Sequence, residues 1–349
     1  MRRLRASLGL VALAVVSACD IPTRAPIYDT EWSVPGKSAQ ISVNALLPTG
    51  VSSMADNSAF RVAVSPSSSA ITRQLGQDCS ACAAANGFVV PKPSFVGGGA
   101  TSLTLPTSIS SVTLVRDTVT LTISNGYNFD PIRPSATALG YLTIVVTNGS
   151  TVVGRDSIDG ATSSLAAGAT VTRKIPLNGT INAASGLQFA TTLSSPLGDP
   201  VAIDMSRTVS VSANLSALFV SQAQVSIANQ QVSSSSTDLD LTGVSESVTK
   251  RASGGSLQLS IDNPFTVSGN LTLEFTGGDG VVTKSVPLAA GSTTPVVSFT
   301  KEELNQLLGH EITISYSGSV NGSSVMVRPG QTVTVSSRLQ VAINMGGSN

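Results

Sequence analysis

The feature that most constrains the fold of this chain is an alternation of apolar and polar residues with a period of two. It begins near Ser38 and recurs almost to the end of the 349 residues. The clearest runs are Ile41–Ala45, Val119–Ile123, Leu257–Ile261, Leu271–Phe275, Ile312–Tyr316, Val333–Val335 and Leu339–Ile343. Alternation of this kind gives a strand one buried and one solvated face, as in antiparallel sheets.

Turn signals separate these runs and keep the predicted strands short and evenly spaced. They are Asn148-Gly149, Asn178-Gly179, Gly277–Gly280 and Asn321-Gly322. Asn-Gly favours the tight turns of β-hairpins, and many short strands with regular turns are typical of β-sandwiches. The sequence therefore predicts an all-β fold of tandem immunoglobulin-like antiparallel β-sandwiches, and its length is enough for two domains with a core each.

One short segment carries helix signals instead. Thr300 and Glu303 have the spacing of a capping box, and Leu304 and Leu307 give an apolar face. Gly309 follows where a helix C-terminus is expected. We predict one short crossover helix between two sheets.

The chain also repeats itself, which indicates a duplication. The motif Leu-Ala-Ala-Gly occurs at residues 165–168 and again at 288–291. Further matches, in the same order, are Ile123–Asn125 with Ile261–Asn263, Leu142–Ile144 with Leu271–Leu273, and Thr208–Ser212 with Thr332–Ser336. Convergence of strands rich in Ser, Thr and Val is the alternative, but the constant order favours two copies of one sandwich.

These patterns predict the domain boundaries. Residues 38–222 are expected to form the first sandwich, with an N-terminal extension and a disulfide loop, and residues 223–349 the second. Whether residues 38–109 form a separate unit stays open at this point. Residues 19–37 contain three prolines without clear periodicity, which predicts an extended tether.

The N-terminus has the pattern of an export signal. Met1–Arg5 is basic, and residues 8–18 are apolar but too few to span about 30 Å of hydrocarbon. The sequence Val16-Ser17-Ala18-Cys19 resembles the lipobox of bacterial lipoproteins. The resemblance implies that residues 1–18 are a signal peptide, and that Cys19 is lipidated and becomes the first residue of the mature protein. An ordinary secretory signal with a chance cysteine is the alternative.

Charge and composition bear on the possible functions. Twenty Lys and Arg balance twenty Asp and Glu, which gives no electrostatic footprint for nucleic acid. The single histidine makes a metal hydrolase or a nucleophilic triad hard to assemble. We therefore expect no catalysis, no metal site and no cofactor.

Cys79 and Cys82 form the most conspicuous motif of the chain. A haem attachment site would need histidine at position 83, where the chain has Ala83, and a zinc site would need two further ligands. Redox chemistry would need a βαβ context that the flanking loop does not offer. In an exported protein we therefore predict a local disulfide between these two residues.

Tyr127, Phe129 and Asp130 lie together in a predicted loop at one end of the first sandwich, and we mark them as a possible ligand loop. Aromatic side chains on such loops can stack against sugars. The second copy has Phe265 at the matching place, which favours the other interpretation, that an aromatic residue closes the core in both copies.

The sequence thus predicts a bacterial envelope protein held to the membrane through Cys19, facing the periplasm or the cell surface, with a structural or adhesive role. Its partner would be an unidentified envelope protein. A glycan-binding module is the alternative. A hydrolase that uses carboxylates alone is a third interpretation, although the acidic residues are scattered mainly in turns.

Overall fold

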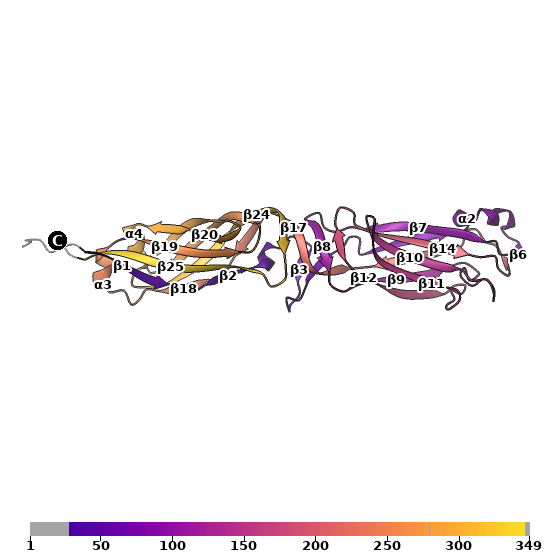
Figure 1. The fold of residues 1–349 in the computed structure, drawn as a ribbon, viewed down its shortest axis with the longest axis horizontal. Coiled ribbons are helices and arrows are strands. Elements are labelled where there is room, and N and C mark those ends of the chain that lie inside the picture. The colour runs from indigo at the N-terminus through magenta and orange to yellow at the C-terminus, as the bar shows by residue number, and fades with distance from the viewer. Residues whose placement is uncertain (1–27, 279, 346–349) are drawn as a thin grey trace, which may run out of the picture.

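A computed structural model describes residues 28–278 and 280–345 of the chain, which form an elongated rod of β-structure (Figure 1). Two β-sandwiches lie end to end along the rod, and a group of junction strands connects them. All pairings between its strands are antiparallel apart from one isolated bridge, so the expected all-β, antiparallel sandwich fold is confirmed. No helix among the described residues is both long and apolar enough to cross a membrane.

Sandwich A, at the right of Figure 1, consists of two four-stranded sheets. Its first sheet has the order β5 (Ser68–Gln74), β16 (Thr208–Asn214), β9 (Asp117–Asn125) and β12 (Thr170–Leu177). Its second sheet has the order β7 (Phe95–Leu103), β14 (Leu187–Ser195), β10 (Tyr141–Asn148) and β11 (Thr151–Asp159). Inward-facing residues alternate with outward-facing ones along these strands, as in β9, where every second side chain is buried.

Sandwich B, at the left of Figure 1, repeats this arrangement. In its first sheet β1 (Tyr28–Pro35) and β2 (Ala39–Ser42) both pair with β25 (Thr332–Met345). Next to β25 lies β19 (Ala252–Asn263), which pairs on its other side with β22 (Gly291–Thr293) and β23 (Val296–Phe299). Its second sheet has the order β18 (Thr237–Asp240), β24 (Glu311–Val327), β20 (Ser268–Gly277) and β21 (Gly280–Leu288). Each strand or strand pair of sandwich B thus has a counterpart at the same place in sandwich A, as a duplication requires.

The junction strands connect the two sandwiches through the backbone. They are β3 (Val51–Ser53), β4 (Phe60–Ala63), β8 (Ile109–Leu114), β13 (Thr180–Asn182) and β17 (Ala217–Ser233). The first half of β17 pairs with β4 and β8, and its second half pairs with β24 of sandwich B. At about 3.3 Å per residue, its seventeen residues span roughly 56 Å. A single strand therefore runs from one unit into the other.

The predicted tether and domain boundary need a correction. Residues 28–35, assigned from sequence to the tether, form β1 and pair with β25 over eight residue pairs. Residues 39–42, assigned to the first sandwich, form β2 and pair with the same strand. The chain therefore starts in sandwich B, crosses to build sandwich A, and returns through β17. The partner strand lies about 300 residues away, where local sequence patterns carry no information about it.

Five short helical segments accompany the strands within residues 28–278 and 280–345. They are η1 (Val43–Leu46), α2 (Leu75–Asp78), η2 (Ser80–Ala85), α3 (Glu246–Arg251) and α4 (Lys301–Leu307). The expected crossover helix is α4, which leads from β23 in one sheet to β24 in the other. Thr300 and Glu303 form both bonds of the capping box, and Leu304 and Leu307 are buried. The other four segments were not predicted.

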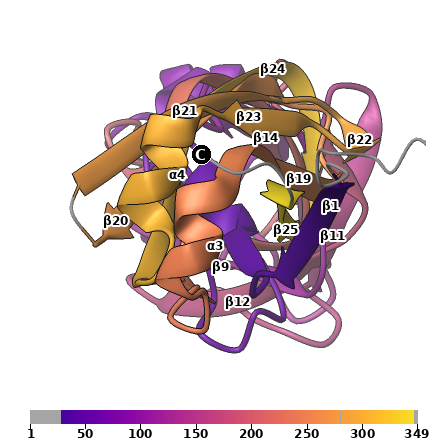
Figure 2. The same ribbon diagram turned by 90° about the vertical axis from the view of Figure 1, so that its left-hand side faces the viewer.

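The two ends of the described chain lie at the same end of the rod. Tyr28 and Met345 are partners in the β1–β25 register. Figure 2 views the molecule from this end, with β1, α3 and α4 toward the viewer. The opposite end, called the tip here, carries α2, η2 and the two-stranded ribbon of β6 (Val89–Pro91) and β15 (Pro200–Ala202).

Candidate functional site

A buried asparagine organises the loops at the tip, and sandwich B repeats it. Asn125 ends β9, and its Nδ2 donates to the carbonyl oxygens of Phe129, Leu165 and Ala166 at 2.8, 2.7 and 3.0 Å. Its Oδ1 accepts the N–H of Tyr127 at 2.9 Å. The side chain therefore ties the loop after β9 to the turn before β12.

Asn263 does the same at the end of β19. Its Nδ2 donates to the oxygens of Val267 and Ala289 at 3.3 and 2.8 Å, and its Oδ1 accepts the N–H of Phe265 at 3.1 Å. Leu165–Ala166 and Ala289 belong to the two copies of the Leu-Ala-Ala-Gly motif. The repeated residues therefore have the same structural task in both sandwiches.

The loop marked as a possible ligand site is part of the core. Tyr127 is 1% exposed and stacks on Phe129 at 5.2 Å between ring centroids, and Phe95 meets both rings edge-on. Asp130 is half-buried, and its carboxylate accepts the N–H groups of Ile132, Arg133 and Leu165. Neither aromatic ring can stack on a sugar, so the core interpretation holds for them. The flat aromatic faces are used within the protein.

Cys79 and Cys82 form a disulfide at the tip, as the sequence predicts. Both sulfur-bearing residues are buried, at the point where α2 ends and η2 begins. The bridge closes a ring of only a few residues and contributes local rigidity more than global stability. Cys19 lies outside the described residues.

A buried lysine lies beneath the same tip loops. Lys92 is 1% exposed, and its Nζ donates to the Pro93 carbonyl oxygen, Ser195 Oγ and the Pro196 carbonyl oxygen at 2.9, 2.7 and 2.5 Å. The rings of Phe95 and Phe129 lie 4.7 and 5.3 Å from the ammonium nitrogen, within cation–π range. Burial lowers the pKa of Lys92 to about 8. All three donors are used inside the protein, so this lysine joins loops and is closed to a ligand.

An ion pair closes the space between the edge strands of sandwich A. Arg73 on β5 contacts Asp78 on α2 at 2.6 Å, and the Asp78 side chain is only 3% exposed. On β7, a Cβ at Gly97 would collide with the side chain of Asp78, and a Cβ at Gly99 would collide with the side chain of Ile71. The glycines of β7 therefore permit β5 and α2 to lie against it.

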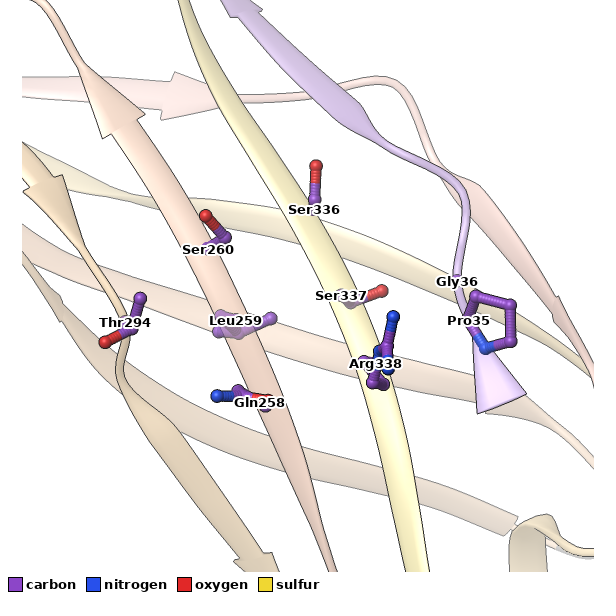
Figure 3. Close-up of a pocket in the computed structure, with 9 residues that line it drawn as sticks. All are labelled: Pro35, Gly36, Gln258, Leu259, Ser260, Thr294, Ser336, Ser337 and Arg338. Carbon is purple, nitrogen blue, oxygen red and sulfur yellow. The ribbon is translucent and has the colours of Figure 1, made fainter. Parts of the chain in front are cut away.

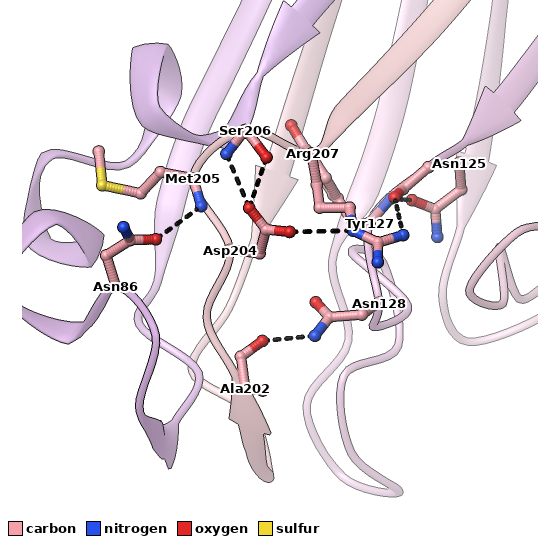
Figure 4. A network of polar contacts seen from close by, with 10 residues as sticks. Asn86, Asn125, Tyr127, Asn128, Ala202, Asp204, Met205, Ser206 and Arg207 are labelled. Carbon is pink, nitrogen blue, oxygen red and sulfur yellow. Dashed lines mark hydrogen bonds and ion pairs between the residues drawn. The ribbon is translucent and has the colours of Figure 1, made fainter.

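Side-chain to backbone bonds tie the remaining tip loops together (Figure 4). The side-chain amide of Asn128 donates to the carbonyl of Ala202, and Asn86 Oδ1 accepts the N–H of Met205 at 3.1 Å. Asp204 accepts the N–H and hydroxyl of Ser206 at 3.0 and 2.6 Å, and the hydroxyl bond lowers the pKa of this carboxyl. The tip is therefore a set of mutually bonded loops on a rigid base.

Apolar side chains nevertheless project from this base. Twelve large apolar side chains are exposed among the described residues, and six of them belong to segments at the tip end. These segments are β6 and the residue before it, the first residues of β7 and β10, and the loops beside β10 and β14. We call these six residues the tip cluster: Phe88, Val89, Val96, Leu139, Tyr141 and Leu197. Their exposed fractions range from 46% to 70%. Within the cluster Val96 and Tyr141 flank Ser194 on neighbouring strands, so their side chains share one outward face.

Open cavities also lie away from the tip. One of about 450 Å³ lies on the outer face of sandwich B, where β1 gives way to β2 (Figure 3). Outward side chains of Gln258, Ser260, Ser336 and Arg338 border it. A larger one of about 810 Å³ at the junction is lined by hydroxyl, amide and small apolar groups between β8 and β13. Neither lining includes a pair of carboxylates or a histidine, and no group of three potential metal ligands occurs in the described ranges.

Comparisons with known proteins add no family. No protein-family model matches the chain, and no curated protein matches it. Among solved structures, a protein from Parabacteroides distasonis described as secreted is 10% identical, with coverage of 91% of this chain and 100% of that chain and a TM-score of 0.33. The cowpea mosaic virus top component is 10% identical, with coverage of 81% and 91% and a TM-score of 0.22. At TM-scores below 0.5 these likenesses carry no argument about function.

Sequence reasoning missed the features that dominate the tip. Lys92 lies between two prolines with no pattern around it, and its partners Ser195 and Pro196 are more than 100 residues away. The exposed apolar residues are ordinary strand formers whose exposure depends on tertiary packing. The run Gly97–Gly99 was a usable signal, because glycines inside a strand often mark close backbone approach.

Proposed function

We propose that the chain is a lipid-anchored stalk of the bacterial cell envelope, and that its tip cluster makes contact with a partner protein. The observation that carries the proposal is the placement of the two ends. The described chain begins at Tyr28, at the end of the rod opposite the tip cluster. Cys19 precedes Tyr28 by nine residues, so an extended chain of that length reaches about 30 Å.

This geometry supports a role in contact. With an anchor at Cys19, sandwich B would lie near the membrane and sandwich A would carry the tip cluster outward. Solvent-exposed apolar groups gathered in one place are a common mark of protein–protein contact surfaces. The loops beneath them are bonded to one another, so little ordering cost accompanies binding.

Membrane anchoring is tested by fractionation of cells that carry the wild-type chain or Cys19→Ala. We expect wild type in the membrane fraction and the variant in the soluble fraction. A variant that stays membrane-bound refutes the lipid anchor. Protease treatment of intact cells then decides the side: cleavage of wild type while a periplasmic marker survives places the stalk at the cell surface, and resistance until the envelope is opened places it in the periplasm.

Contact through the tip is tested by photo-crosslinking in cells. The crosslinking residue is placed at Phe88 or Leu197 and, as a matched control, at Val152, which is similarly exposed but lies on β11 near the junction. Crosslinked products from the two tip positions that are absent from Val152, and that disappear with Leu139→Ser, support the proposal. Equal products from all three positions refute it.

Glycan binding is the second candidate, and we assign it to Tyr141 because Tyr127 and Phe129 are buried. Tyr141 is 46% exposed on the outward face of β10, beside Ser194 of β14. Titration calorimetry with cell-wall polysaccharide fragments should then show heat with wild type and a marked loss with Tyr141→Ala, whereas Tyr127→Phe should bind as wild type. Absence of heat with wild type removes this candidate.

A further inference from the structure

We infer that β1 is a mechanical clamp, which resists a pull between the N-terminal end of the rod and the tip because its bonds to β25 are loaded in shear. The inference rests on the proposed function only for the source of the force, a membrane at one end and a bound partner at the other. The mechanical property itself follows from strand direction, register and the position of the ends.

The pairing of β1 has the geometry that shear requires. Its eight residues pair continuously with β25, from Tyr28 with Met345 to Pro35 with Arg338. The strand starts at the end of the rod and runs along its long axis toward the junction (Figures 1 and 2). Hydrogen bonds in an antiparallel pair lie perpendicular to the strands. A pull on Tyr28 along the axis therefore strains the whole ladder together.

Neighbouring contacts reinforce this ladder on both sides. After a short break, β2 adds four more residue pairs with β25, and the Ser38 and Ser336 hydroxyls bond at 3.0 Å inside the break. Trp32 and Val34 of β1 pack against the core. On its other side β25 pairs with β19 over ten residues, so the strand that receives the load is central to its sheet.

The same arrangement continues into sandwich A. Beyond β2 the chain passes through the junction and becomes β5, which runs toward the tip and ends at α2. β5 pairs over seven residues with β16, the counterpart of β25. The N-terminal strand of each sandwich is thus paired with the C-terminal strand along the axis of the rod, and the load passes from one ladder to the next.

The direction of pulling separates this inference from simple stability. Because Tyr28 and Met345 are register partners, a pull that separates the two chain ends opens β1 from β25 one pair after another. The identical bonds are then loaded singly. A clamp must therefore resist a pull from the N-terminal end to the tip strongly, and a pull that separates the two chain ends weakly.

The test is single-molecule pulling on the full chain in a Cys19→Ala background, with handles on two introduced thiols. Asp20→Cys with Leu197→Cys pulls from end to tip, and Asp20→Cys with Ser348→Cys pulls the two chain ends apart. Since shear loads about eight residue pairs together, we expect the first rupture at a force at least about twofold higher in the first geometry. The released length identifies the event when the two chain ends are pulled apart. In that geometry β1 folds back as it peels, so the gain should match residues 28–35 or 28–42, roughly 30–50 Å.

Equal forces in the two geometries, or a first release of a different length when the two chain ends are pulled apart, overturn the inference. No lipid and no partner take part in this measurement. If Cys19→Ala stays in the membrane, the lipid anchor is refuted, but the two rupture forces are unaffected. If the two forces are equal, the clamp is refuted, but the result of the fractionation is unaffected.

Discussion

Replacing Asn125 by alanine should be among the most costly polar substitutions in the chain. The side chain is 1% exposed, and its two Nδ2 hydrogens serve three carbonyl oxygens at 2.7–3.0 Å while Oδ1 accepts one N–H at 2.9 Å. Its removal takes this partner from three backbone groups, the carbonyl oxygens of Phe129 and Leu165 and the N–H of Tyr127, whereas the Ala166 oxygen also accepts the Ala169 N–H. Loss of a buried partner costs about 1–3 kcal/mol per group left unpaired, so Asn125→Ala should destabilise by about 3–5 kcal/mol.

The repeat supplies an internal comparison. Asn263 makes bonds of the same kind, but one of them is longer, at 3.3 Å, and it reaches one carbonyl fewer. Asn263→Ala should therefore cost less than Asn125→Ala, about 2–4 kcal/mol. Asn270→Ala is the matched control, because Asn270 is exposed on β20, and its cost should stay within about 0.5 kcal/mol.

Urea unfolding followed by circular dichroism measures these differences. Trp32 lies in sandwich B, so its fluorescence reports on that unit separately. The reasoning is refuted if Asn125→Ala costs less than about 1 kcal/mol, because water or backbone movement would then replace the asparagine at little cost. It is also refuted if Asn270→Ala costs as much as the two buried substitutions.

Three further outcomes are expected from single residues. Burial lowers the pKa of Lys92 from 10.5 to about 8, so the free energy of unfolding should rise as pH increases from about 8 to 10.5. The urea concentration at the midpoint of unfolding should increase over this pH range in wild type. The increase should be absent in Lys92→Met. Burial raises the pKa of Asp117, whose Oδ2 has no hydrogen-bond partner among the described residues, so the stability that this group contributes is present at low pH and lost as pH rises above 3.8. Asp117→Asn keeps an acceptor for the Phe219 N–H and should therefore raise the melting temperature at pH 7. A lower melting temperature would contradict the assignment. In Gly98→Ala the new Cβ would collide with the Thr191 carbonyl oxygen, so a cost of about 2 kcal/mol or more is expected in urea unfolding, against about 0.5 kcal/mol or less for Gly243→Ala, which meets open space.

Much of the fold was predictable because burial of one sheet face leaves a mark in sequence. The alternation through Val119–Ile123 and Leu257–Ile261 corresponds to the buried positions of β9 and β19. The capping box at Thr300 predicted α4 because both of its bonds are local. The repeated Leu-Ala-Ala-Gly motif indicated the duplication, and the structure supplies its reason in the carbonyl oxygens that Asn125 and Asn263 bind.

The prediction failed where distant residues decide the outcome. Residues 28–35 do alternate, with Tyr28, Trp32 and Val34 on one side, but the nearby prolines favoured a tether over a strand. Their partner, residues 338–345 of β25, could not be read from the local sequence. Tyr127 and Phe129 have the composition of a ligand loop, but both rings are buried. The side chains of Asn125 and Asp130 hydrogen-bond to the backbone of this loop and hold the rings inward.

The sequence by itself determined the fold class, the turns, the duplication, the crossover helix and the expectation of a lipid anchor at Cys19. Each of these is recorded in short motifs whose residues are close together in the chain, and the duplication is recorded in the recurrence of such motifs. Only the tertiary structure decided that sandwich A is built between two parts of sandwich B, that β17 spans both units, and which apolar residues remain exposed at the tip. The reason is physical: strand pairing and burial are satisfied between residues hundreds of positions apart, and no local pattern records which partner is chosen.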